Sequence, residues 1–123
     1  MSDPSTGKSR VLVVEDEYLI RMLLEDMLVD QGYDVTAAVG TINEAREQAE
    51  SAAFDVAILD VNLDGEEVFP IADVLVKRGL PFVFVTGYGQ ASLPDNYRDH
   101  AALQKPFKAD QLRAMLSELL AAA

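Results

Sequence analysis

Residues 10–17 read RVLVVEDE, a short run of apolar and mostly β-branched residues that is followed directly by three acidic ones. A run that is apolar on both faces is typical of a strand in a parallel sheet, because helices cover both sides of such a sheet. The three carboxylates then fall at the carboxyl end of that strand. This stretch predicts the class of fold and also the edge of the sheet at which polar groups gather.

Outward from this stretch, short apolar runs alternate with segments of helical spacing along the whole chain. The predicted strands are Arg10–Val14, Asp34–Val39, Phe54–Leu59, Pro81–Val85 and Ala101–Leu103. The predicted helices are Glu17–Gln31, a helix opened by Thr41 that runs to about Ala52, Glu66–Arg78 and Lys108–Ala121. The interval 87–100 is the least regular, and any helix in it is short. This alternation predicts an α/β fold of (βα)5 type, a parallel sheet with helices on both faces.

Two local patterns support the predicted helices. The first helix carries two apolar ladders at i, i+4 spacing, which are Leu19, Leu23 and Met27 beside Ile20, Leu24 and Leu28. The residues from Thr41 to Glu44 (TINE) form a capping box, in which a hydroxyl and a carboxylate satisfy free amides at a helix start. Both patterns predict amphipathic helices that pack on the sheet.

Composition narrows the classes of function. The chain has 123 residues, which fits one domain at 10–121 after a flexible lead at 1–9, and its formal net charge is −11. Such an acidic surface repels phosphate backbones and anionic lipid, so we expect neither nucleic acid nor a membrane as partner. There is no cysteine and a single histidine, His100, which excludes thiolate sites and multi-histidine metal sites. No signal peptide or membrane-spanning run is visible, and we expect a cytoplasmic protein.

Polar residues stand at the ends of the predicted strands: Glu15 and Asp16, then Asp60, Thr86 and Lys105. The carboxyl ends of parallel strands lie at one edge of a sheet, so these side chains should meet in one shallow site. Closely spaced carboxylates suit Mg²⁺, and a carboxylate such as Asp60 can attack phosphorus. Lys105 would neutralise the charge on the transferred group, and the Thr86 hydroxyl could donate a hydrogen bond to it.

Each of these residues also has a simpler interpretation. Asp16 could be only a helix N-cap, Glu15 a solvated acid, Asp60 a turn residue, Thr86 a plain strand-end residue, and Lys105 a surface lysine. The functional interpretation rests on their joint placement, since each residue type stands at the end of the appropriate strand.

The chain resembles the bacterial two-component receiver (response-regulator) family in the segments VLVVEDE, VAILDVNL, FVFVTGYG and LQKPF, at residues 11–17, 56–63, 82–89 and 103–107. The resemblance implies a flavodoxin-like sheet of order 2-1-3-4-5. It also implies that Asp60 is the phosphoacceptor and that Glu15, Asp16, Asp60 and the Asn62 carbonyl bind Mg²⁺. Thr86 would be the switch hydroxyl and Lys105 the partner of the phosphoryl group. The implied phosphodonor is a phosphohistidine on a sensor histidine kinase or a histidine phosphotransfer protein.

Three departures from the family pattern bear on how the signal leaves the domain. The usual aromatic switch residue three before the lysine is replaced by Ala102, Gly87-Tyr88-Gly89 follows Thr86, and the loop at 61–65 is short. The Thr-Gly-Tyr-Gly sequence resembles a subgroup of mostly single-domain receivers. We hypothesise that Tyr88, between two glycines, replaces the missing aromatic as the moving part; alternatively, Tyr88 only packs on the surface.

Other functions remain open at this point. The chain could be a receiver that binds its partner without phosphorylation, a phosphatase with an aspartate nucleophile, or one module of a larger regulator. A phosphatase of that kind usually has a second carboxylate where Asn62 stands, so we expect a non-enzyme. The absence of an output domain favours a stand-alone protein, whose downstream protein partner would bind about residues 90–120. Output, phosphate sink and phosphorelay roles are equally compatible with the sequence.

Overall fold

The computed structural model describes residues 8–88 and 92–122. Five parallel strands form one sheet: β1 (Arg10–Val14), β2 (Asp34–Val39), β3 (Val56–Asp60), β6 (Phe82–Thr86) and β7 (Ala102–Gln104). Their order is β2-β1-β3-β6-β7, which is the expected 2-1-3-4-5 order of the receiver fold when the strands of this sheet alone are counted. Most of the predicted lead, residues 1–7, and Gly89 lie outside the described residues.

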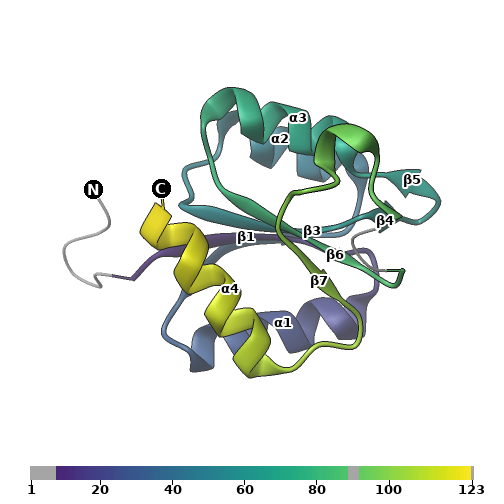
Figure 1. The fold of residues 1–123 in the computed structure, drawn as a ribbon. Helices are drawn as coiled ribbons and strands as arrows, with labels where there is room; N and C mark the ends of the chain where they lie inside the picture. Colours follow the sequence, from purple (N-terminus) through teal and green to yellow (C-terminus); the bar gives the residue numbers. More distant parts are fainter. Residues whose placement is uncertain (1–7, 89–91, 123) are drawn as a thin grey trace.

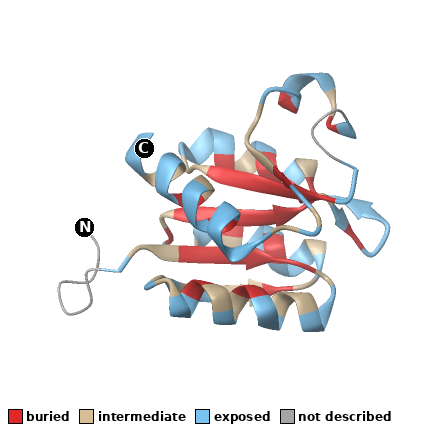
Figure 2. Ribbon diagram, turned by 60° about the horizontal axis from the view of Figure 1, so that its bottom comes forward, coloured by how far each residue is buried: buried red, intermediate tan, exposed pale blue. Residues whose placement is uncertain are grey.

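Helices cover the sheet on both faces, as the alternation of the sequence predicts (Figure 1). Helices α2 (Ile42–Ser51) and α3 (Phe69–Arg78) lie on one face, and α1 (Tyr18–Asp30) and α4 (Ala109–Ala122) lie on the other. The three central strands, β1, β3 and β6, are almost entirely buried between these two layers, whereas the edge strands β2 and β7 are partly exposed and the outer faces of the helices are exposed (Figure 2). Alternate residues of each strand therefore enter two separate apolar clusters, one under each pair of helices.

The capping box and the apolar ladders that the sequence predicts are both present, with differences in their contacts. The Thr41 hydroxyl accepts a hydrogen bond from the Glu44 N–H at 3.2 Å and caps α2. The Glu44 carboxylate accepts from that same hydroxyl at 3.0 Å, rather than from the backbone as the capping box predicts. Of the two ladders on α1, only one is buried: Leu24 and Leu28 enter the core, while Leu19 and Leu23 are 73% and 57% exposed.

The predicted helix Glu66–Arg78 begins too early. Glu66 and Glu67 form a short strand, β5 (Glu66–Glu67), which pairs antiparallel with β4 (Asn62–Leu63), and α3 starts only at Phe69. The turn between these strands is Asp64-Gly65, in which both residues have positive φ, 51° and 88°. An Asp-Gly pair is the residue choice for a tight two-residue hairpin turn. The hairpin therefore ends before the helix, whose first turn holds Pro70.

The irregular interval 87–100 contains the 3₁₀-helical turn η2 (Asp95–Tyr97). Tyr97 anchors this turn in the core among the rings of Phe69, Phe82 and Phe84. Over residues 8–88 and 92–122, no helix has the length and hydropathy required to cross a bilayer.

Candidate functional site

The sheet brings the predicted polar residues to a single edge. Asp60 is the last residue of β3 and Thr86 is the last residue of β6, while Glu15-Asp16 directly follow β1 and Lys105 follows β7. Strand pairing fixes their relative positions, because β3 lies between β1 and β6 with Leu59 opposite both Val14 and Phe84. The chemistry therefore gathers where the central strands end, as expected for an open parallel sheet.

Three carboxylates form the centre of the site. One ligand oxygen from each of Glu15, Asp16 and Asp60 lies within 4.8 Å of the others. Glu15 and Asp60 are buried, at 1% and 6% exposure, and Asp16 is half-buried. Burial of several negative charges is unfavourable unless a cation neutralises them, and carboxylate oxygens are ligands that Mg²⁺ prefers.

Lys105 lies against two of these carboxylates. Its Nζ is 3.3 Å from Asp60 Oδ2 and 3.2 Å from Glu15 Oε1. Within the described part of the chain, the buried Glu15 Oε1 makes no hydrogen bond, since the contact with Lys105 is an ion pair without hydrogen-bond geometry. A buried carboxylate oxygen left in this state fits a site that completes its coordination with a metal ion.

The pKa values of the site reflect crowded negative charge. Burial, followed by the neighbouring Asp60 carboxyl, raises the pKa of Glu15 to about 7. Burial also raises the pKa of Asp60, although Glu15 and Lys105 oppose that rise. For Lys105, burial disfavours the ammonium, but the charges of Asp60 and Glu15 outweigh burial and raise the pKa. The metal-free site therefore holds a proton on Glu15 more readily than an ordinary glutamate would.

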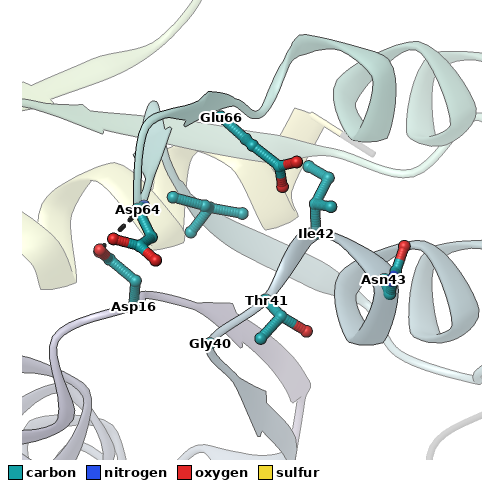
Figure 3. A pocket seen from close by; sticks show the side chains of 8 residues that line it. Asp16, Gly40, Thr41, Ile42, Asn43, Asp64 and Glu66 are labelled. Carbon is teal, nitrogen blue, oxygen red and sulfur yellow. Dashed lines mark hydrogen bonds between the residues drawn. The ribbon is translucent and has the colours of Figure 1, made fainter.

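Asp16 lies toward solvent and contacts the β4–β5 hairpin. Its Oδ2 accepts a hydrogen bond from the Asp64 N–H at 3.0 Å, and the two residues border a cavity of about 700 Å³ (Figure 3). Burial opposes ionisation here, yet hydrogen bonds from Glu15 and the Asp64 N–H prevail and lower the pKa of Asp16. The N-cap of α1 is Glu17, so the N-cap interpretation of Asp16 is wrong.

Asn62 connects strand β3 to the hairpin. Its N–H donates to Asp60 Oδ1 at 3.4 Å, and its side-chain oxygen accepts from the Gly65 N–H at 2.7 Å. The hairpin thus holds the backbone directly after Asp60. This hairpin was not predicted from the sequence, although the Asp64-Gly65 pair is a usable signal for its turn.

Thr86 is buried and takes part in the local structure of the next segment. Its Oγ1 accepts a hydrogen bond from the Tyr88 N–H at 3.1 Å and lies 3.4 Å from Ser92 Oγ. The Tyr88 side chain is 87% exposed and makes no ring contact within the described residues. The threonine is therefore linked to the start of the segment that follows it, whereas the tyrosine ring projects into solvent.

Comparison with known proteins identifies the type of domain. A model of the response regulator receiver domain matches residues 11–117. The transcriptional regulatory protein PdtaR of Mycobacterium tuberculosis is 38% identical over 121 residues, which cover 91% of this chain and 59% of PdtaR. This chain thus spans less than two thirds of that relative.

Solved structures agree with this assignment. The solution structure of SdrG from Sphingomonas melonis Fr1 matches with a TM-score of 0.81 and 42% identity, covering 92% of this chain and 97% of SdrG. The BeF₃-activated conformation of SdrG, from Pseudomonas melonis Fr1, matches with a TM-score of 0.78 and 41% identity, covering 98% and 99% of the two chains. The similarity therefore includes nearly the whole of each domain.

Proposed function

The chain belongs to the response regulator receiver family, and from this premise we propose that it accepts a phosphoryl group on Asp60 from a phosphohistidine. The single observation that supports this most strongly is the surrounding of Asp60. The residue is buried at the end of β3, with an oxygen of each of two further carboxylates within 4.8 Å and the Lys105 ammonium 3.3 Å away. Receiver domains are signalling modules of two-component systems rather than classical enzymes.

Glu15, Asp16 and Asp60 are the proposed ligands of Mg²⁺, with the backbone carbonyl of Asn62 as a further ligand. When bound, Mg²⁺ neutralises charge on the phosphoryl oxygens during transfer. In the transfer step, an Asp60 oxygen forms the new O–P bond while the P–N bond to the donor imidazole breaks, and the electron pair returns to that nitrogen. Lys105 balances negative charge on the product, so the ammonium keeps the acyl phosphate paired.

Thr86 is the proposed switch hydroxyl. It now accepts a hydrogen bond from the Tyr88 N–H. A hydroxyl can donate and accept together, so it is a displacement of Thr86 Oγ1 toward the phosphoryl group that would break this contact and release the backbone at Gly87 and Tyr88. We expect the change to reach protein partners through the surface formed by the described part of residues 90–120.

The phosphodonor is proposed to be a sensor histidine kinase or a histidine phosphotransfer protein that docks on α1. The first half of α1 exposes Tyr18, Leu19, Met22 and Leu23. A groove of about 400 Å³ joins Leu23 and Met27 of this helix to Lys105 and Phe107. A partner seated there would stand beside the site and could present a histidine to Asp60.

The decisive experiment is incubation with Mg²⁺ and acetyl phosphate, followed by mass spectrometry of the intact protein. We expect a gain of one phosphoryl group that is stable in acid and labile in base. Asp60→Asn should abolish the gain, whereas Asp55→Asn, an aspartate near the opposite end of β3, should keep it. A gain that persists in Asp60→Asn would reject Asp60 as acceptor.

The alternative is a binding module that acts without phosphorylation. It would be favoured if the wild type gained no phosphoryl group and if BeF₃⁻ with Mg²⁺ produced no structural change at Thr86 and Lys105. SdrG, which is similar over nearly its whole length, has a BeF₃-activated conformation, so this reagent suits the comparison.

A further inference from the structure

Both backbone polar groups of Glu15, the N–H and the carbonyl, are hydrogen-bonded. Its N–H donates to the Val39 carbonyl, at the end of β2, at 2.9 Å. Its carbonyl accepts a hydrogen bond from Arg21 Nη1 at 2.7 Å. The carbonyl belongs to the peptide group that joins Glu15 to Asp16, so Arg21 fixes the orientation of the link between the two acidic residues.

The guanidinium of Arg21 occupies space that is left by Gly40. A β-carbon placed on Gly40 would lie 2.5 Å from Arg21 Nη1 and 3.4 Å from the Glu15 oxygen. Gly40 has no positive φ, whereas Gly32, Gly65 and Gly79 do and have nothing within 4 Å of the same position. Glycine at position 40 therefore provides room for the arginine and not a special backbone conformation.

The position of Arg21 beside the acidic loop is supported by its place on α1 and by its contact with Tyr18. Arg21 comes from the first turns of α1 and is half-buried, and its Cζ lies 5.6 Å from the Tyr18 ring centroid. The helix, the end of β2 and the acidic loop are thus joined at one point beside the site. Gly40 and Asp16 also border the same cavity (Figure 3).

We propose that Arg21 is a positioning residue for the Mg²⁺ ligands Glu15 and Asp16, and that Gly40 is the space in which it is seated. This inference rests on the proposed metal site and goes beyond it, because Arg21 is not among the proposed ligands and acts through the Glu15 carbonyl. A group that orients metal ligands contributes to affinity through them, and losing it costs about 10- to 100-fold in metal binding.

The charge of Arg21 allows this role to be separated from simple electrostatics. Removing a positive charge from a protein of net charge −11 should favour a cation. Loss of Mg²⁺ affinity in an arginine variant would therefore run against the charge effect. Arg46→Ala, which removes an exposed arginine on α2, is the matched control for charge alone.

The test is an Mg²⁺ titration of the full chain, in which binding is monitored by the NMR chemical shifts of the amides of residues 15, 16 and 60. The melting temperature of each variant is measured separately in EDTA. Gly40→Ala keeps the guanidinium but pushes it from the Glu15 carbonyl, and Arg21→Ala removes it. We expect each variant to raise the Kd for Mg²⁺ at least about tenfold. Among the described residues, the one distance under 3.0 Å from a Cβ at position 40 is to Arg21 Nη1, so Gly40→Ala should add little in the Arg21→Ala background.

The outcomes are distinct. A wild type that does not bind Mg²⁺ would reject the proposed metal site itself. If the wild type binds Mg²⁺ and both Arg21→Ala and Gly40→Ala bind it with an unchanged Kd, the positioning role is overturned. A loss in Arg46→Ala equal to that in Arg21→Ala would also overturn it, as would additive effects in the double variant. If Gly40→Ala melts below the assay temperature, Arg21→Ala and its control still decide the question.

Discussion

Tyr97 shows how one residue can fix a segment that has little regular structure. Its hydroxyl donates to Asp73 Oδ1 on α3 at 2.6 Å, and its ring stacks on Phe69 with centroids 5.9 Å apart. Burial, reinforced by the hydrogen bond to Asp73 and its charge, raises the pKa of the phenol. The chain that follows Thr86 is thus tied to a helix on the same face of the sheet.

Removal of this hydroxyl should weaken the fold while the ring contacts remain. We expect Tyr97→Phe to lower the free energy of unfolding by about 1 kcal/mol, since one hydrogen bond to a carboxylate is lost and the exposed Asp73 is rehydrated. Urea denaturation measures the change. Tyr88→Phe, at an exposed hydroxyl, should stay within about 0.5 kcal/mol of the wild type. Equal stability of the two variants would show that the hydrogen bond makes no net contribution.

At the residue scale, the sequence was sufficient for site members that stand at strand ends. Strand direction alone predicts that Glu15, Asp60 and Lys105 meet, and the structure places them together. Arg21 could not be found in this way. Its contact with the carbonyl of Glu15, which lies six residues earlier and before the helix begins, follows no helical periodicity, and the space at Gly40 that admits it is visible only in three dimensions.

At the scale of elements, the sheet was predictable because a buried parallel strand reads as a continuous apolar run. The β4–β5 hairpin was missed because each of its strands has only two residues, too few for any alternation to be recognised. The i, i+4 spacing of apolar residues on α1 correctly predicted a helix, but periodicity alone could not show which of the two apolar ladders faces the sheet. Packing buries Leu24 and Leu28 and leaves Leu19 and Leu23 in solvent.

The exposed apolar face of α1 has a testable use. Leu19→Ala and Leu23→Ala should slow phosphoryl transfer from a histidine kinase that labels the wild type, by about tenfold if these residues anchor the partner. Transfer from acetyl phosphate, which needs no docking surface, should not change. Val29→Ala is the control, because Val29 is equally apolar and exposed but lies ten residues from Leu19, roughly 15 Å along the helix.

Comparing the transfer rates from the histidine kinase and from acetyl phosphate separates a loss of docking from damage to the phosphorylation site. A variant impaired with both donors would indicate damage to the site, and a Val29→Ala variant as slow as Leu19→Ala would argue against a localised docking face.

At the scale of the whole molecule, the fold concentrates negative charge in its own interior. The chain carries a net charge of −11, and the parallel sheet buries two of the three clustered carboxylates at one edge. The residues that we propose as Mg²⁺ ligands therefore oppose the stability of the metal-free fold. Lys105 offsets part of this repulsion, since it lies within 3.3 Å of both buried carboxylates.

This opposition predicts how stability depends on pH. The pKa of Glu15 is raised to about 7 in the folded protein, above its ordinary value of 4.5. Stability associated with its protonated form is complete below pH 4.5 and is lost as the pH rises through 7. Glutamine resembles the protonated acid, so Glu15→Gln should match the wild type near pH 4 and exceed it at pH 8, by on the order of 1 kcal/mol in EDTA.

Saturating Mg²⁺ should reverse that order at pH 8. A ligand that binds only the folded state stabilises it by RT ln(1 + [L]/Kd), about 2.7 kcal/mol at a hundred times Kd, and the variant has lost one ligand oxygen. Urea denaturation at both pH values, with EDTA and with Mg²⁺, measures all of these differences. A Glu15→Gln variant whose relative stability is independent of pH would show that Glu15 carries no buried charge in the metal-free protein, and that the crowding of carboxylates is relieved by some other group.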